Sequence, residues 1–125
     1  MLTIAKYFLL PKLFLFSLFL CDNKPNILVV QATAYNSVKS QTSDNPTLAA
    51  WGDTLSPGMK IVAVSRDLIK LGLDHNTEVK IQGFEGSYVV KDKMNRRWKQ
   101  KIDIYMGLDV KAAKKWGIRK VNICW

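Results

Sequence analysis

Residues 89–109 read VVKDKMNRRWKQKIDIYMGLD and contain two short strand patterns separated by a basic loop. The first pattern ends at Asp92. In the second, isoleucines at alternate positions point to one side while Asp103 and Tyr105 point to the other, because side chains alternate along a strand. Aspartate has low β propensity and is costly to bury without a partner. The segment therefore predicts two strands and marks Asp92 and Asp103 as candidate site residues.

The rest of the chain contains further short segments of regular structure. Four are rich in β-branched residues and bounded by turn formers, which is typical of strands. Two others have helical character: one follows Ser65 as a possible N-cap, and the other lies between Asp109 and Gly117. The strand segments are 27–35, 59–65, 77–82 and 118–125, and the helical ones are 66–72 and 108–116.

Six short strands without regular βαβ alternation predict a mainly β fold. A small closed six-stranded barrel with one or two short helices satisfies this pattern and leaves no exposed sheet edge. At 125 residues, the chain has room for one such domain.

The first 21 residues, MLTIAKYFLLPKLFLFSLFLC, contain no acid and end in an apolar run. This pattern resembles a secretory leader, although a membrane anchor is an alternative. Cys21 directly follows the apolar run, as in a bacterial lipoprotein, but Leu20 stands where a small residue is usual. We expect residues 1–26 to be a signal peptide or a membrane or lipid anchor, and residues 27–125 to form the domain.

This division predicts an exported protein of the periplasm or cell envelope that contacts a membrane only through its N-terminal segment. It also predicts no disulfide, because a Cys21 that belongs to a leader leaves Cys124 without an intramolecular partner.

The chain carries 19 Lys and Arg against 10 Asp and Glu, a net charge of +9, which favours polyanionic surroundings. Such a surplus could also indicate that the basic loop binds nucleic acid. Export argues against this function, so no nucleic acid partner is predicted.

Familiar catalytic and cofactor motifs are absent from the sequence, including the P-loop, HExxH and CxxC. The single histidine, His75, lies in the polar stretch LDHNTE, which predicts a solvated turn. No metal ion and no cofactor is predicted.

Over residues 33–125 the chain resembles the three-aspartate (3D) domain, a double-psi β-barrel of the type found in rare lipoprotein A and membrane-bound lytic transglycosylase A. The resemblance rests on the order and spacing of several motifs. These are Thr33-Ala34-Tyr35, Gly52 and Gly58 before IVAV, Leu71-Gly72, Asp92, and KIDIY around Asp103, with ten residues between the two aspartates.

The resemblance implies a protein that acts on peptidoglycan glycan strands, with Asp103 as catalytic acid and base and Asp92 as its partner. Ser65 occupies the place of the family's first aspartate and Asp67 follows two residues later, so both are possible supporting residues together with Tyr35. The family's loop between the second and third aspartates is rich in glycine, whereas here it reads KMNRRWKQK.

Two alternatives to catalysis remain at this point. The first is a non-catalytic barrel that binds peptidoglycan or a wall partner; its candidate substrate-binding residues are Trp98, Arg96, Arg97, Trp51 and Tyr105. The second is structural: the two aspartates would form salt bridges with the Lys and Arg residues of their own loop.

Overall fold

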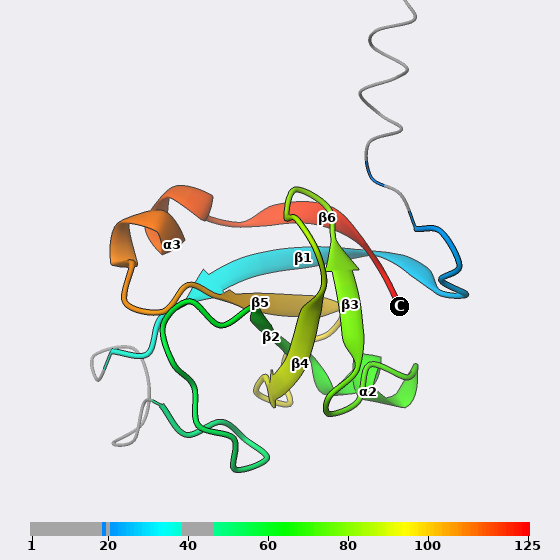
Figure 1. The fold of residues 1–125 in the computed structure, drawn as a ribbon. Coiled ribbons are helices and arrows are strands. Elements are labelled where there is room, and N and C mark those ends of the chain that lie inside the picture. The colour runs from blue at the N-terminus through cyan, green and yellow to red at the C-terminus, as the bar shows by residue number, and fades with distance from the viewer. Residues whose placement is uncertain (1–18, 20, 39–46) are drawn as a thin grey trace, which may run out of the picture.

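The computed structural model describes residues 19, 21–38 and 47–125, which fold into a closed barrel (Figure 1). The strand order around the barrel is β1-β5-β2-β4-β3-β6. Two short helices accompany these strands. The elements are β1 (Ile27–Tyr35), β2 (Ile61–Val64), α2 (Arg66–Lys70), β3 (Glu78–Ile81), β4 (Tyr88–Lys93), β5 (Lys101–Tyr105), α3 (Val110–Trp116) and β6 (Arg119–Cys124).

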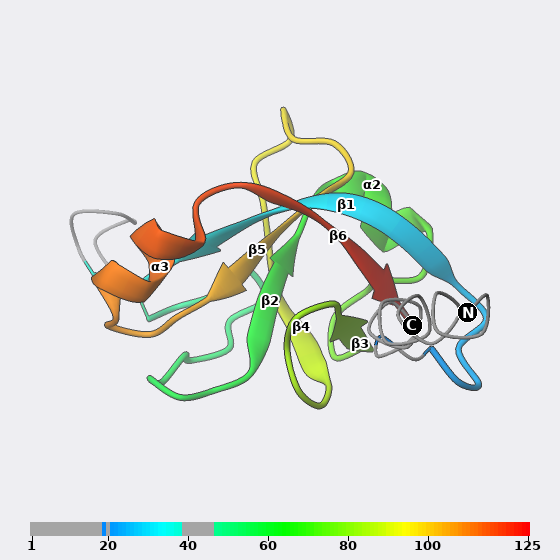
Figure 2. The same ribbon diagram turned by 90° about the horizontal axis from the view of Figure 1, so that it is seen from above.

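The barrel mixes parallel and antiparallel pairs. Strand β1 runs parallel to β5, and β2 runs parallel to β4, whereas the other four pairings are antiparallel. The predicted hairpin is present, with β3 and β4 paired through Glu78↔Val89 and Val79↔Tyr88. The expected mainly β fold with six strands and two short helices is confirmed. Seen from above, α3 lies at the opposite end of the barrel from the C-terminus (Figure 2).

Alternation along each strand separates an inner face from an outer one. The inner face forms the main core, with fully buried side chains such as Val62, Val64, Ile102 and Ile104. Burying a side chain of this size contributes about 1.5 to 3 kcal/mol. These alternating aliphatic positions hold β2 and β5 in register and thereby fix the direction of the side chains between them.

The outer face of β2 and β5 is covered by the segment that precedes β2. Ala49 and Leu55 pack there against Ile61 and Tyr105 in a second apolar cluster. A turn closed by hydrogen bonds from Ala49 N to Asp53 O and from Gly52 N to Ala49 O shapes this segment. It therefore lies beside the outer face of the sheet, where the two aspartates are found.

The two helices begin at the predicted residues. Asp109 caps α3 by accepting a hydrogen bond from Ala112 N at 3.0 Å. Ser65 occupies the N-cap position of α2, but its hydroxyl accepts from Lys101 N at 3.0 Å instead of capping the helix. Ser65 thus links the start of α2 to the start of β5.

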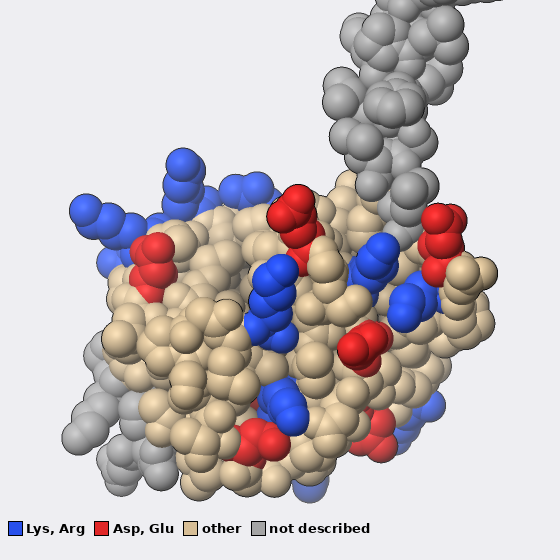
Figure 3. Space-filling model, viewed as in Figure 1, with Lys and Arg blue, Asp and Glu red and all other residues tan. Residues whose placement is uncertain are grey.

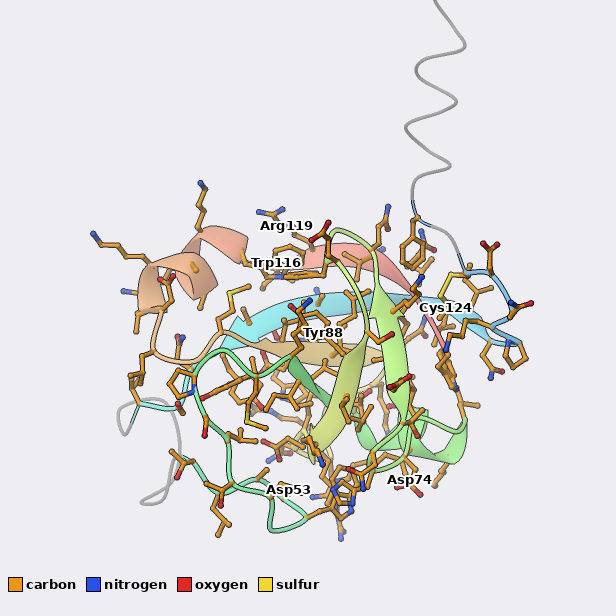
Figure 4. The ribbon with its side chains drawn as sticks, viewed as in Figure 1. Asp53, Asp74, Tyr88, Trp116, Arg119 and Cys124 are labelled. Carbon is orange, nitrogen blue, oxygen red and sulfur yellow. A yellow bond between two sulfur atoms is a disulfide. The ribbon has the colours of Figure 1, made fainter. Side chains whose placement is uncertain are left out.

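A disulfide joins Cys21 to Cys124, so the prediction that there is no disulfide is wrong. The pair lies where the chain enters β1 and leaves β6, as the position of Cys124 in Figure 4 shows. Backbone bonds between Asn26 and Trp125 hold the same ends together. A Cys21 sulfur in this disulfide does not also carry a thioether-linked lipid.

Most of the predicted leader lies outside the described residues. Residues 21–26 are described, and the disulfide attaches them to the barrel. Within the described part of the chain, no helix has the length and apolar character required to span a bilayer.

Candidate functional site

Asp92 and Asp103 occupy one row of residues that crosses four adjacent strands. The register pairs Asp92 of β4 with Ala63 of β2, Ala63 with Asp103 of β5, and Asp103 with Thr33 of β1. Directly paired residues direct their side chains to the same face of a sheet. The two carboxyl groups therefore share the outer face with only the methyl group of Ala63 between them, and their Cα atoms are about 10 Å apart at ordinary strand spacing.

A β-bulge places Asp92 in this row. The register between β2 and β4 shifts after Val62↔Val90, so that Ala63 faces Asp92 and Lys91 is the extra residue. In a regular strand Asp92 would follow Tyr88 and Val90 to the inner face, since side chains alternate. The extra residue turns the carboxyl outward, as bulges commonly do near functional sites.

Asp103 is partly buried and forms no ion pair with any residue that the structure describes. Its Oδ1 accepts a hydrogen bond from Thr33 Oγ1 at 2.9 Å. Burial raises the pKa of Asp103 to about 6; the hydrogen bond from Thr33 opposes this shift, the charge of Asp92 adds to it, and the charge of Lys101 opposes it. A carboxyl group with this pKa carries a proton over part of the pH range near neutrality and can donate it.

Asp92 has several hydrogen-bond donors. Its Oδ1 accepts from Ala50 N at 2.9 Å and from Lys93 N at 3.0 Å, and Tyr35 Oη lies 3.5 Å from its Oδ2. Burial raises the pKa of Asp92, whereas these three bonds and the charge of Lys93 lower it. Asp92 is thus the better stabilised carboxylate of the pair, and it supplies negative charge close to Asp103.

The structure contradicts the salt-bridge interpretation of the two aspartates. In the described residues, both ion pairs involve Asp53, which contacts His75 Nε2 at 2.5 Å and Lys91 Nζ at 3.5 Å. Asp92 and Asp103 have no such partner there. Neither carboxyl group is therefore neutralised by an ion pair in the described part of the chain.

A pocket of about 220 Å³ opens over the row. Both aspartates line it, together with Tyr35 and Trp98 from the predicted set. Its other lining residues are Ala63, Lys93, Met94 and Asn95. Among the described residues, no cluster of potential metal ligands occurs.

The two candidate tryptophans differ in their positions. Trp98 lines the pocket and has Lys101 Nζ over its ring at 3.6 Å from the centroid and Arg97 Cζ at 4.6 Å. Trp51 lies outside the pocket lining and stacks on His75 at a centroid distance of 4.8 Å, with Lys93 Nζ over its ring at 5.1 Å.

The remaining predicted residues lie around the site but do not line the pocket. Ser65 and Asp67 secure the start of β5, because Asp67 Oδ2 accepts from Gln100 N at 2.9 Å and Ser65 holds the next residue. Tyr105 is buried and its hydroxyl bonds to Ser37 at 2.7 Å. Arg96 is exposed in the loop between β4 and β5.

Sequence reasoning missed a second polar cluster beside the pocket. His75 does lie in a turn, but it also pairs with Asp53, and Lys91 contacts both Asp53 and Asn76. The bond to His75 lowers the pKa of Asp53. Figure 4 places Asp53 on the lower edge of the barrel. This cluster ties the segment that carries Ala50 to the bulge residue, and no motif in the sequence indicated it.

A search with protein-family models finds no match to this sequence, and a comparison with curated proteins finds none either. Among solved structures, the fold is similar to the crystal structure of apo expansin from Clavibacter michiganensis, with a TM-score of 0.52 and 18% sequence identity. The similarity covers 78% of this chain and 49% of the expansin chain, so the chain spans about half of that relative's length. At this identity it establishes a shared double-psi-like barrel fold.

Proposed function

We propose that this protein acts on glycan strands of the bacterial cell wall and cleaves them at the pocket over Asp92 and Asp103. The observation that carries the proposal is the state of Asp103: its side chain is partly buried, has no ion-pair partner among the described residues, and has a pKa raised to about 6. Such a group is matched to acid catalysis near neutral pH.

The reaction follows from one carboxyl group that gives and then regains a proton. Protonated Asp103 donates to the glycosidic oxygen as its bond to the anomeric carbon breaks. The resulting carboxylate removes the proton from a hydroxyl group of the same sugar, whose oxygen bonds to that carbon and closes an anhydro ring. The donated proton stays on the hydroxyl group of the leaving sugar, Asp103 is reprotonated by the attacking hydroxyl group, and water is not consumed. The negative charge of Asp92 stabilises the positive charge that develops on the sugar.

Three further observations support this assignment. The resemblance to the three-aspartate domain covers both aspartates, and the barrel fold shared with an expansin is consistent with it at the level of architecture. The disulfide fits an oxidising compartment outside the cytoplasm. These observations favour a wall-associated protein over a cytoplasmic one.

Binding without cleavage is the second candidate. It is favoured by the hydrogen bonds of Asp92. This carboxylate accepts bonds from two backbone N–H groups and so has a structural role in holding the segment around Ala50. The loop between the aspartates is also basic and lacks glycine, unlike the catalytic members of the family it resembles. A barrel of this kind would bind peptidoglycan or a wall partner through the same pocket.

One experiment distinguishes the two candidate functions, cleavage and binding. Purified full-length protein is incubated with peptidoglycan glycan strands and the products are analysed for anhydro sugars by mass spectrometry. The D103N variant is expected to release none, while E85Q, which changes an exposed carboxylate, is expected to retain activity. If wild-type protein releases no anhydro product but sediments with intact wall, cleavage is refuted and binding remains.

A further inference from the structure

Residues 91–101 supply Lys93, Met94, Asn95 and Trp98 to the pocket lining and form its strongly basic rim, with Lys93 as the cation that lines the pocket itself. Residues 91–101 contain six Lys and Arg and one acid, Asp92. Of these cations only Lys91 has a carboxylate partner among the described residues, and that partner is Asp53. A rim with this imbalance attracts anions to the pocket entrance.

Three of the cations are placed by aromatic rings. Lys101 and Arg97 lie over the ring of Trp98, and Lys93 lies over the ring of Trp51. A cation over an indole face is held electrostatically and keeps N–H groups that can donate elsewhere. Such contacts restrict the side chains before a ligand arrives, which lowers the entropic cost of binding.

The same contacts argue against an uncharged sugar as the main ligand. A neutral sugar binds an indole through the apolar face of its ring, but Trp51 already stacks on His75 and both tryptophans carry cations over their rings. What the rim offers a ligand is charged N–H donors. These match carboxylate oxygens, with which they form short, charge-assisted hydrogen bonds.

We propose that the pocket selects glycans whose sugars bear carboxylate groups, which bind to Lys93, Arg97 and Lys101. This inference rests on the proposed function, because it names the substrate class of the same pocket. A ligand carboxylate would also offset the charge of Lys101, which lowers the pKa of Asp103. Binding of the anionic ligand therefore favours the protonated acid that cleavage requires.

Helix α3 provides a matched control surface. Lys111, Lys114 and Lys115 are exposed on it, and the adjoining β6 begins with further cations. Figure 3 shows Lys and Arg side chains gathered over α3, which packs against β1 and contributes nothing to the pocket lining. Neutralising three lysines there changes the net charge as much as neutralising Lys93, Arg97 and Lys101 but leaves the site intact.

The test uses the full chain carrying D103N, so that ligand is not consumed, and two matched ligands. One is a tetrasaccharide of alternating N-acetylglucosamine and N-acetylmuramic acid, and the other is the same tetrasaccharide with its carboxylates methyl-esterified. We expect the acid form to bind at least about tenfold more tightly by calorimetry at low salt, where ion pairing is strongest. K93Q/R97Q/K101Q should abolish the difference, and K111Q/K114Q/K115Q should preserve it.

Each outcome has a distinct meaning. Equal binding of acid and ester overturns the inference and leaves the proposed function standing. Loss of the preference in the α3 variant also overturns it, because the selectivity would then come from overall charge. If neither ligand binds, the proposed function fails with the inference. The single variant K101Q, checked for folding by circular dichroism, should reduce the preference partly even if the triple variant is unstable.

Discussion

The substitution Asp103→Asn should stabilise the protein at neutral and alkaline pH. Asn is neutral at all pH values and similar in size, and its Oδ1 can still accept the hydrogen bond from Thr33. It therefore removes the cost of holding a charge in a partly buried position close to Asp92. A destabilising residue is expected where function requires it. The variant therefore measures how much free energy of unfolding the protein loses by keeping a carboxyl group at this position.

The magnitude follows from the shift of the pKa from 3.8 to about 6. Between these values the folded protein holds a proton that the unfolded chain has lost, so the free energy of unfolding falls as pH rises from about 4 to about 6 and then stays level. At about 1.4 kcal/mol per pKa unit, the total loss is on the order of 3 kcal/mol. D103N should lack this loss, match the wild type below pH 4 and exceed it by up to about 3 kcal/mol at pH 8.

The assay is urea denaturation of the oxidised protein at pH 3.5, 5, 6.5 and 8, followed by tryptophan fluorescence. The quantity compared is the difference in free energy of unfolding between wild type and D103N, which cancels the contributions of groups that do not interact with Asp103. The E85Q variant should differ little from wild type across the range. A D103N variant that is less stable than wild type at pH 8, or a difference that does not change with pH, would refute the reasoning.

Three further changes test other parts of the structure by the same denaturation assay. Cys21→Ser with Cys124→Ser should lower the free energy of unfolding by about 2 to 5 kcal/mol, and reductant should do the same to wild type only. Ile104→Ala should cost about 2 to 5 kcal/mol because it empties space in the main core, whereas exposed Ile118→Ala should stay within about 0.5 kcal/mol. Ala63→Leu, which inserts a larger side chain between the two carboxyl groups, should cost about 1 to 3 kcal/mol and abolish glycan binding measured by calorimetry.

Local patterns were sufficient to predict the strands and helices. Alternating aliphatic residues in KIDIY placed Asp103 and Tyr105 on one face, and the structure confirms this because Ile102 and Ile104 lie in the main core. The cap residue Asp109 was equally visible, since an N-cap bond involves residues only three apart. These features depend on short-range geometry, which the sequence expresses directly.

Features that depend on long-range geometry were not predictable in the same way. The bulge at Lys91 reverses the direction that alternation gives Asp92, and nothing in VVKDK distinguishes a bulged strand from a regular one. The pairing of Asp53 with His75 joins segments 22 residues apart, and the disulfide joins residues 103 apart. The sequence therefore indicated the two aspartates but not the contacts that orient them.

The orientation of the loop cations determines which chemistry the aspartates can perform. If Lys101 contacted Asp103 directly, it would keep the carboxyl group ionised and the site could only bind. Instead, its Nζ lies 3.6 Å from the centre of the Trp98 ring, and its charge only partly opposes the effect of burial on the pKa of Asp103. Under the proposed function, the contact with Trp98 keeps this cation away from the acid, so that one loop supplies positive charge for binding a ligand while Asp103 retains a proton to donate.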